Sequence, residues 1–145
     1  GVKPFVVKFD ISSEYFVEKA GNKYLFKLGD LIGPQMEMYQ EKKRILPLEA
    51  EFNRSYYRTI KINIPEGYQI SNLEDIKIKN SYATKDKELF IFDSYYTLEG
   101  NVLTVTADEH YRETFVAPEI FEAYRTVINS AADFNKVTLV LEPKK

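Results

Sequence analysis

Leu89-FIFDSYYTLEGNVLTVT-Ala107 is the stretch of sequence that decides the fold. Its first four residues are apolar without alternation, a pattern typical of a strand buried on both faces. The tripeptide Glu99-Gly100-Asn101 predicts a turn, and apolar residues then alternate with threonines at Leu103, Val105 and Ala107. We therefore expect an antiparallel hairpin over residues 95–111, with residues 89–92 in a central strand.

Further strands are predicted on both sides of this hairpin. Residues 5–11 alternate apolar and polar side chains, and residues 14–19 and 23–27 flank a Gly-Asn turn signal at 20–22. Residues 58–64 place three isoleucines on one face, and the turn signal Pro65-Glu66-Gly67 follows them. The remaining predicted strands are an edge strand over 45–52 that contains Pro47, a short strand over 76–79, and a last strand over 137–141.

One helix is predicted, over residues 118–132. Pro118 suits a first helical turn, and Glu119 is favourable near a helix amino terminus. Asp133-Phe134-Asn135 is expected to break the helix. The apolar residues in between fall on one stripe at helical spacing, and we expect this stripe to pack on a sheet: Ile120, Phe121, Tyr124, Val127, Ile128 and Ala131.

The composition fits one packed domain. Of the 145 residues, 44% are hydrophobic and 14% aromatic, which is ample for a core. We expect a mainly β fold, an antiparallel β-sandwich with one amphipathic helix near the carboxyl terminus, as a single domain over residues 1–145. Because the chain opens on Gly1 without a methionine, we also expect it to be a piece excised from a longer protein.

Charge and residue usage exclude several functions. The net charge is −2 and the longest basic run is Lys42-Lys43-Arg44, so a nucleic-acid partner is not expected. No window is apolar for long enough to span a bilayer. The absence of cysteine excludes a disulfide framework, a thiol nucleophile and a cysteine-ligated metal.

Two motifs invite a functional interpretation and receive a structural one. His110 is the only histidine and lies among acidic residues, but a metal site needs three or four converging ligands, so we expect a solvated strand end.

The glycines of Gly29-Asp-Leu-Ile-Gly33-Pro34-Gln35 match neither a dinucleotide fingerprint nor a P-loop. We expect Gly29 to end a strand, Leu31 and Ile32 to point inward, Gly33-Pro34 to bend the chain and Gln35 to bond loop backbone groups. Met36 and Met38 are then expected to share a strand face as core filler. No catalytic, metal or cofactor residue is predicted, and no cofactor.

The aromatic residues are 11 Tyr and 10 Phe, with no Trp. In a regular strand, one ring of Tyr56-Tyr57 and one of Tyr95-Tyr96 must point outward. Outward rings can stack on sugars, but cross-strand ring packing is also ordinary sheet chemistry.

Three ordered segments carry a resemblance, over residues 27–45, 57–79 and 124–143. They contain Gly-x-x-Ile-Gly-Pro-Gln at 29–35, Ile-Pro-x-Gly-Tyr at 64–68 and Tyr-Arg-x-x-x-Asn-x-x-x-x-Phe at 124–134. The chain resembles the carboxy-terminal β-rich domain that follows the transglutaminase-like domain in a family of bacterial envelope proteins. In such proteins the thiol triad lies in the upstream domain, so the resemblance implies no catalytic residue here.

The resemblance therefore implies a non-catalytic accessory or interaction domain in the bacterial periplasm or cell envelope. Its expected partner is the upstream transglutaminase-like domain of the parent protein, on which it would pack or help to present substrate. The alternative is a free-standing carbohydrate- or peptide-binding β-sandwich module. An exposed aromatic row in a cleft would favour the alternative, and an apolar patch near the amino terminus would favour the accessory domain.

Overall fold

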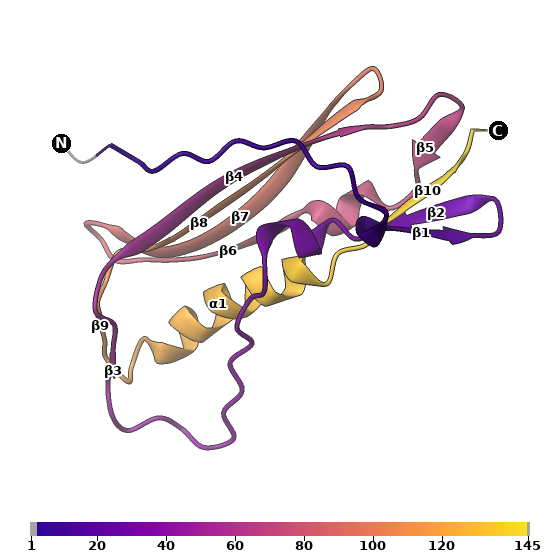
Figure 1. Ribbon diagram of the computed structural model, residues 1–145. Helices are drawn as coiled ribbons and strands as arrows, with labels where there is room; N and C mark the ends of the chain where they lie inside the picture. The colour runs from indigo at the N-terminus through magenta and orange to yellow at the C-terminus, as the bar shows by residue number, and fades with distance from the viewer. Residues whose placement is uncertain (1–2, 145) are drawn as a thin grey trace.

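The computed structural model describes residues 3–144 and is dominated by one twisted antiparallel sheet (Figure 1). The strands lie in the order β4-β8-β7-β6. β7 and β8 form the long predicted hairpin, and Ser94 lies opposite Ala107 in their register. The strand bounds are β4 Arg54–Asn63, β6 Ile78–Ala83, β7 Glu88–Glu99 and β8 Val102–Tyr111.

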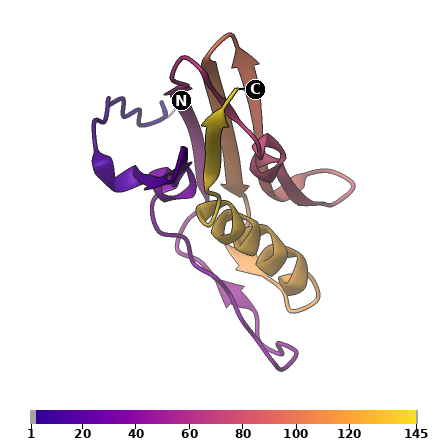
Figure 2. The ribbon, with the colours of Figure 1, turned by 90° about the vertical axis from the view of Figure 1, so that its right-hand side faces the viewer.

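Helix α1 (Phe121–Asn135) and a second antiparallel sheet together cover one face of the large sheet (Figures 1 and 2). The second sheet has the order β1-β2-β10-β5, so the strand that follows α1 lies between strands from the first half of the chain. A third pair, β3 with β9, adjoins the amino-terminal end of α1. The bounds are β1 Val17–Ala20, β2 Lys23–Phe26, β3 Leu48–Glu49, β5 Tyr68–Ile70, β9 Phe115–Val116 and β10 Leu139–Pro143.

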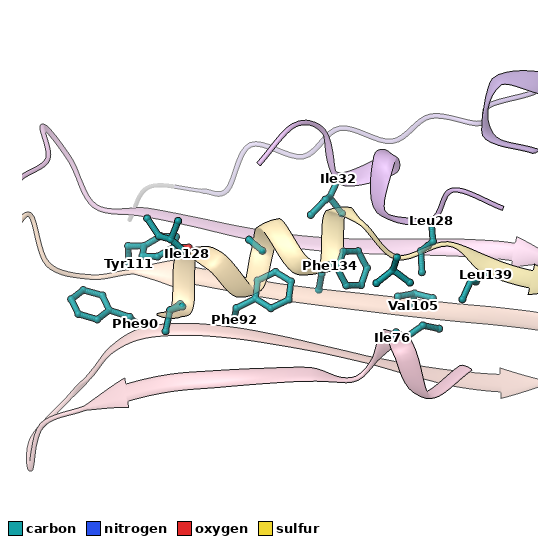
Figure 3. Close-up of a cluster of buried hydrophobic side chains, with 14 of the residues drawn as sticks. Leu28, Ile32, Ile76, Phe90, Phe92, Val105, Tyr111, Ile128, Phe134 and Leu139 are labelled. Carbon is teal, nitrogen blue, oxygen red and sulfur yellow. The ribbon is translucent and has the colours of Figure 1, made fainter. Parts of the chain in front are cut away.

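The core lies between these two layers (Figure 3). Phe92 of β7 and Phe134 of α1 meet with ring centroids 5.8 Å apart, and both side chains are fully buried. Phe90 packs edge-on against Tyr124 of the helix at 5.1 Å. The mainly antiparallel β architecture with one carboxy-terminal helix confirms the predicted fold class. Among the described residues, no helix has the length and apolarity to cross a membrane.

The central predictions are confirmed by burial and pairing. Residues 89–92 are buried on both faces of β7, and Leu103, Val105 and Ala107 of β8 are buried as expected. Thr106, which was expected on the polar face of β8, is buried as well. The predicted hairpin forms from β1 and β2 around positive-φ Gly21, but its first strand starts at Val17, because Glu14–Phe16 form a 3₁₀ helix. Five of the six stripe residues of the helix are buried, and the sixth, Ile120, is half-buried.

The helix is longer at its carboxyl end than predicted. It begins at Phe121 and runs through Asp133-Phe134 to Asn135, where a break was expected. The reason is that Phe134 extends the same stripe by three residues beyond Ala131 and is fully buried. Local helix-breaking tendency is outweighed by core packing at this position.

Three strand predictions are wrong in extent. Residues 5–11 form no strand; their alternation is that of a strand, but backbone ladders need a neighbour, and none pairs with them among the described residues. Of residues 45–52, only Leu48–Glu49 pair, directly after Pro47, which has no N–H to donate. Ile76 ends the 3₁₀ helix Leu73–Ile76, so the strand predicted over 76–79 starts at Ile78 instead.

The segment 29–35 turns a corner, largely as predicted. Ile32 is buried, Leu31 packs against the core, and Gly33 has φ 78° and ψ 170°, a conformation that favours glycine. The Gln35 amide donates hydrogen bonds to the carbonyls of Ile32 and Gly33, at 3.2 and 3.1 Å. Gly29, however, starts the 3₁₀ helix Gly29–Ile32 rather than ending a strand.

The methionines that follow do not behave as predicted. Residues 33–38 are irregular, so Met36 and Met38 share no strand face. The Met36 side chain is 65% exposed, and Met38 is only partly buried against the core. Instead, the Asn129 side chain of α1 accepts from the Met38 N–H and donates to its carbonyl, at 2.8 and 3.1 Å. These two bonds hold the irregular segment on the helix.

Candidate functional site

A groove lies where the irregular segment passes between α1 and the β4 edge of the large sheet. It consists of two adjoining pockets with volumes of about 410 and 320 Å³. Met36, Arg54 and Ile128 line both pockets. The larger pocket is lined by Ile32, Gly33, Pro34, Gln35, Met36, Arg54, Tyr56, Arg58, Glu109, Tyr111, Ile128 and Ala131.

The floor of the larger pocket holds a buried ion pair. Arg58 of β4 donates to the Glu109 carboxylate of β8 at 2.7 Å, and the two side chains are 21% and 5% exposed. Their strands place both side chains on the sheet face that meets α1, because they have the same alternation as Ile60 and Ala107. A carboxylate this deeply buried requires a partner such as Arg58.

Arg54, at the start of β4, lies between the two pockets. Its guanidinium stacks on the Tyr111 ring at 4.7 Å and donates to the Tyr124 hydroxyl at 3.2 Å. The rings of Tyr111 and Tyr124 meet edge-on at 5.5 Å. Strand β8 and helix α1 therefore hold the Arg54 guanidinium in one orientation.

The two tyrosines of this cluster resist ionisation. Burial raises the pKa of Tyr111 well above the ordinary tyrosine value. The neighbouring Glu109 carboxylate adds to that effect, because its negative charge opposes ionisation and it accepts a hydrogen bond from the Tyr111 hydroxyl. Burial also raises the pKa of Tyr124, with Arg54 acting in the opposite direction. Both hydroxyls are therefore neutral at physiological pH; that of Tyr111 donates to Glu109, and that of Tyr124 accepts from Arg54.

The raised pKa of Tyr111 predicts a loss of stability in alkali. Above about pH 10 the unfolded chain loses the tyrosine proton while the folded protein keeps it, so the free energy of unfolding falls as pH rises. One such tyrosine contributes at most about 1.4 kcal/mol per pH unit. Between about pH 9 and 11 the unfolded tyrosine is on average about half ionised, so Tyr111→Phe should reduce the mean slope in urea unfolding by about 0.7 kcal/mol per pH unit.

The exposed Tyr39 provides the matched control for that experiment, because Tyr39→Phe removes a hydroxyl outside the core. The slope in Tyr111→Phe should be smaller than the slope in Tyr39→Phe. An unchanged slope in Tyr111→Phe would show that the hydroxyl ionises as freely in the folded state as in the unfolded chain.

His110 is placed differently from the prediction of a solvated strand end. It is only 8% exposed, because β8 lies in the interior of the sheet between β4 and β7. Its Nε2 lies 3.0 Å from a Glu88 oxygen and its Nδ1 3.8 Å from Asp108. In the described part of the chain, no group of three or more candidate ligands is close enough together to hold a metal ion.

The tyrosine pairs place one ring on each face, as strand alternation predicts. Tyr57 and Tyr95 lie on the face away from α1 and are 68% and 44% exposed. Their hydroxyls are hydrogen-bonded to each other, and this bond raises the pKa of Tyr95. Neither ring lines either pocket of the groove, whereas Tyr56 lines the larger one.

Sequence reasoning missed the residues that give the groove its charge. Arg54, Tyr56 and Arg58 alternate along β4 at the spacing of the inward-facing isoleucines that follow, which was an available signal. The same parity in β8 places Glu109 and Tyr111 inward. A polar continuation of an apolar strand face indicates a partly buried polar cluster.

Fold and groove together define an antiparallel β domain whose two layers enclose a polar cluster at one sheet edge. The chain belongs to a family described as a domain of unknown function with solved structure, DUF3858, whose model matches residues 23–141. No curated protein matches the sequence.

A similar solved structure is a chain from Parabacteroides distasonis described as a "putative protease". The two have a TM-score of 0.55 and 14% sequence identity, and the match covers 71% of this chain. At this identity the similarity concerns the fold alone. The matched part is 19% of the other chain, so this chain corresponds to about a fifth of that protein.

Proposed function

We propose that this chain is a non-catalytic accessory domain of a larger, transglutaminase-like bacterial protein, and that it docks on the upstream domain through its amino-terminal segment. The observation that carries the proposal is the exposure of that segment. Phe5 is 94% exposed, Phe9 is 68% exposed, and the apolar side chains between and beside them are also exposed, namely Val6, Val7 and Ile11.

An apolar segment of this kind favours an interaction over a purely structural role. The alternation of residues 5–11 is suited to burying one face, yet neither face is buried. Contiguous exposed apolar surface on a folded domain commonly marks a contact with another protein or domain. The segment is extended and lies beside the two layers without joining either sheet (Figure 1).

The similar structure from Parabacteroides distasonis adds support, because the matching region makes up only 19% of that chain. A domain of this fold therefore occurs as a minor part of a longer protein. The transglutaminase-like partner, and a location in the bacterial periplasm or envelope, are proposed from the sequence resemblance.

The experiment measures binding of this chain to the separately expressed transglutaminase-like domain of the parent protein by calorimetry. We expect Phe5→Ser/Phe9→Ser to weaken binding at least about tenfold, since two large apolar contacts are lost, with unchanged thermal unfolding. Tyr39→Ser is the matched control, because Tyr39 is 81% exposed but lies outside the segment. Equal affinity of the Phe5/Phe9 variant and the control would contradict the docking role.

A carbohydrate-binding module is the second candidate, and the outward rings of Tyr57 and Tyr95 favour it. Exposed tyrosine rings can stack on sugar faces, although these two lie outside the groove. Titration with chito- and cello-oligosaccharides tests it directly. Saturable binding that Tyr57→Ser/Tyr95→Ser abolishes, together with no binding to the transglutaminase-like domain, would replace the accessory role with this one.

A further inference from the structure

The larger pocket of the groove between α1 and β4 contains one positive charge that no carboxylate of that pocket neutralises. Arg54 is half-buried, and its hydrogen-bond partner Tyr124 and stacking partner Tyr111 are both neutral. No carboxylate in the described part of the chain forms an ion pair with it. Arg58, the other arginine of the groove, is already neutralised by Glu109 at 2.7 Å.

A half-buried arginine with free N–H groups suits a carboxylate, which it can bind through two parallel hydrogen bonds. The stacking contact with Tyr111 fixes the plane of the guanidinium, so little conformational freedom is lost when an anion binds. The larger pocket carries a net charge of about +1, from Arg54, Arg58 and Glu109. This charge matches a single carboxylate.

The smaller pocket limits what else the ligand can carry. It shares Arg54 with the larger one, but the exposed carboxylates of Glu49 and Glu51 also line it. These two charges oppose a second anionic group. A polyanion such as a nucleotide or an acidic peptide is therefore disfavoured, and one negative charge beside apolar surface is favoured.

The walls of the groove suit a peptide. Met36 and Ile128 give both pockets apolar sides. Ala131 adds apolar surface to the larger pocket, and Met38 adds it to the smaller one. The backbone N–H and carbonyl of Met36 bond to no described residue, so they can pair with an extended peptide as one more strand does. The pocket volumes of about 410 and 320 Å³ admit one or two residues each.

We propose that this groove binds the carboxyl terminus of a peptide, with the terminal carboxylate on Arg54 and an apolar side chain between Met36 and Ile128. The peptide backbone pairs with Met36. This site lies apart from the exposed amino-terminal segment, because no residue of 5–11 lines either pocket. It extends the accessory role without depending on it.

The test titrates the isotope-labelled chain with the peptide acetyl-Ala-Phe by NMR. We expect saturable shifts of the amide signals of Met36, Arg54 and Ile128. The peptide amide acetyl-Ala-Phe-NH₂, which lacks only the negative charge, should bind at least about tenfold more weakly. Octanoate, which has a carboxylate and an apolar tail but no peptide group, should also bind about tenfold more weakly. Octanoate binding as tight as the peptide would overturn the assignment to peptides.

Substitutions in the groove test which of its residues bind the peptide. Arg54→Gln should weaken acetyl-Ala-Phe about tenfold, and Glu49→Gln/Glu51→Gln should strengthen it about threefold by removing repulsion. Arg44→Gln is the matched control, since Arg44 is another half-buried arginine that stacks on a ring, Phe121, but lines neither pocket.

Met36→Glu provides a second test if Arg54→Gln fails to fold. Its side chain is 65% exposed, so the folded state tolerates the change, and a new negative charge in the groove should weaken the peptide at least about tenfold. Shifts confined to residues outside the groove, or equal affinity in Met36→Glu and Arg44→Gln, would overturn the proposal. Neither result would bear on docking through residues 5–11.

Discussion

Arg58→Met should lower the free energy of unfolding by about 3 kcal/mol or more, because it leaves the Glu109 carboxylate buried without its counter-charge. Methionine keeps most of the apolar stem of arginine, so the loss reports the charge rather than the packing. The Glu109 side chain is only 5% exposed, so water replaces the lost partner poorly. Urea unfolding at neutral pH measures the effect.

Two variants separate the buried charge from other causes. Arg58→Met/Glu109→Gln removes both charges and keeps an acceptor near the Tyr111 hydroxyl, so it should recover most of the loss. Lys77→Met is the control: it breaks an exposed ion pair in which the Lys77 and Glu74 side chains are 51% and 74% exposed, so it should leave the free energy of unfolding almost unchanged. Similar losses in the single and double variants would show that the ion pair is not what the core requires at this position.

Gly29→Ala should cost about 4 kcal/mol, which is a large part of the total stability of about 5–15 kcal/mol that ordinary domains have. A methyl group at Gly29 would lie 2.3 Å from the backbone oxygen of Asn135 and 2.4 Å from that of Phe134. Because both obstacles are backbone atoms at the end of α1, no side-chain rotation relieves the clash. The shift would also disturb the Gly29 N–H to Val137 carbonyl bond of 2.9 Å.

Gly33→Ala is the internal comparison for that substitution. Gly33 has φ 78°, but a methyl group there meets no atom within 4 Å. Its cost of about 1–3 kcal/mol should come from backbone strain alone. Thermal and urea unfolding of both variants therefore separate close approach from conformation. A smaller loss in Gly29→Ala than in Gly33→Ala would contradict the contact between Gly29 and the helix end.

The local sequence pattern was sufficient to predict a segment's structure where the segment buries one face and its form does not depend on which element covers that face. The hairpin of β7 and β8 was predictable because continuous apolar residues, a Gly-Asn turn and strict alternation all specify the same structure. The stripe of α1 was predictable for the same reason, but its end was not, since the burial of Phe134 depends on Phe92 from another element.

Local pattern failed where the outcome depended on a distant partner. Residues 5–11 have the alternation of a strand and find no strand to pair with in the described fold. The Arg58–Glu109 pair joins residues 51 positions apart, and the alternation that places both arginines of the groove inward does not identify their partners. Gly29 was expected to matter for turning the chain, whereas its contact is with Asn135, at the far end of the sequence.

The sequence by itself determined the fold class, the central hairpin, the inward face of the helix and the corner at Gly33, because periodicity and turn chemistry act over a few neighbouring residues. Only the tertiary structure decided which charges are buried, which apolar segment stays exposed and where a groove opens. Those properties depend on the register of β4 on β8 and on the seating of α1, both set by contacts between residues far apart in the chain.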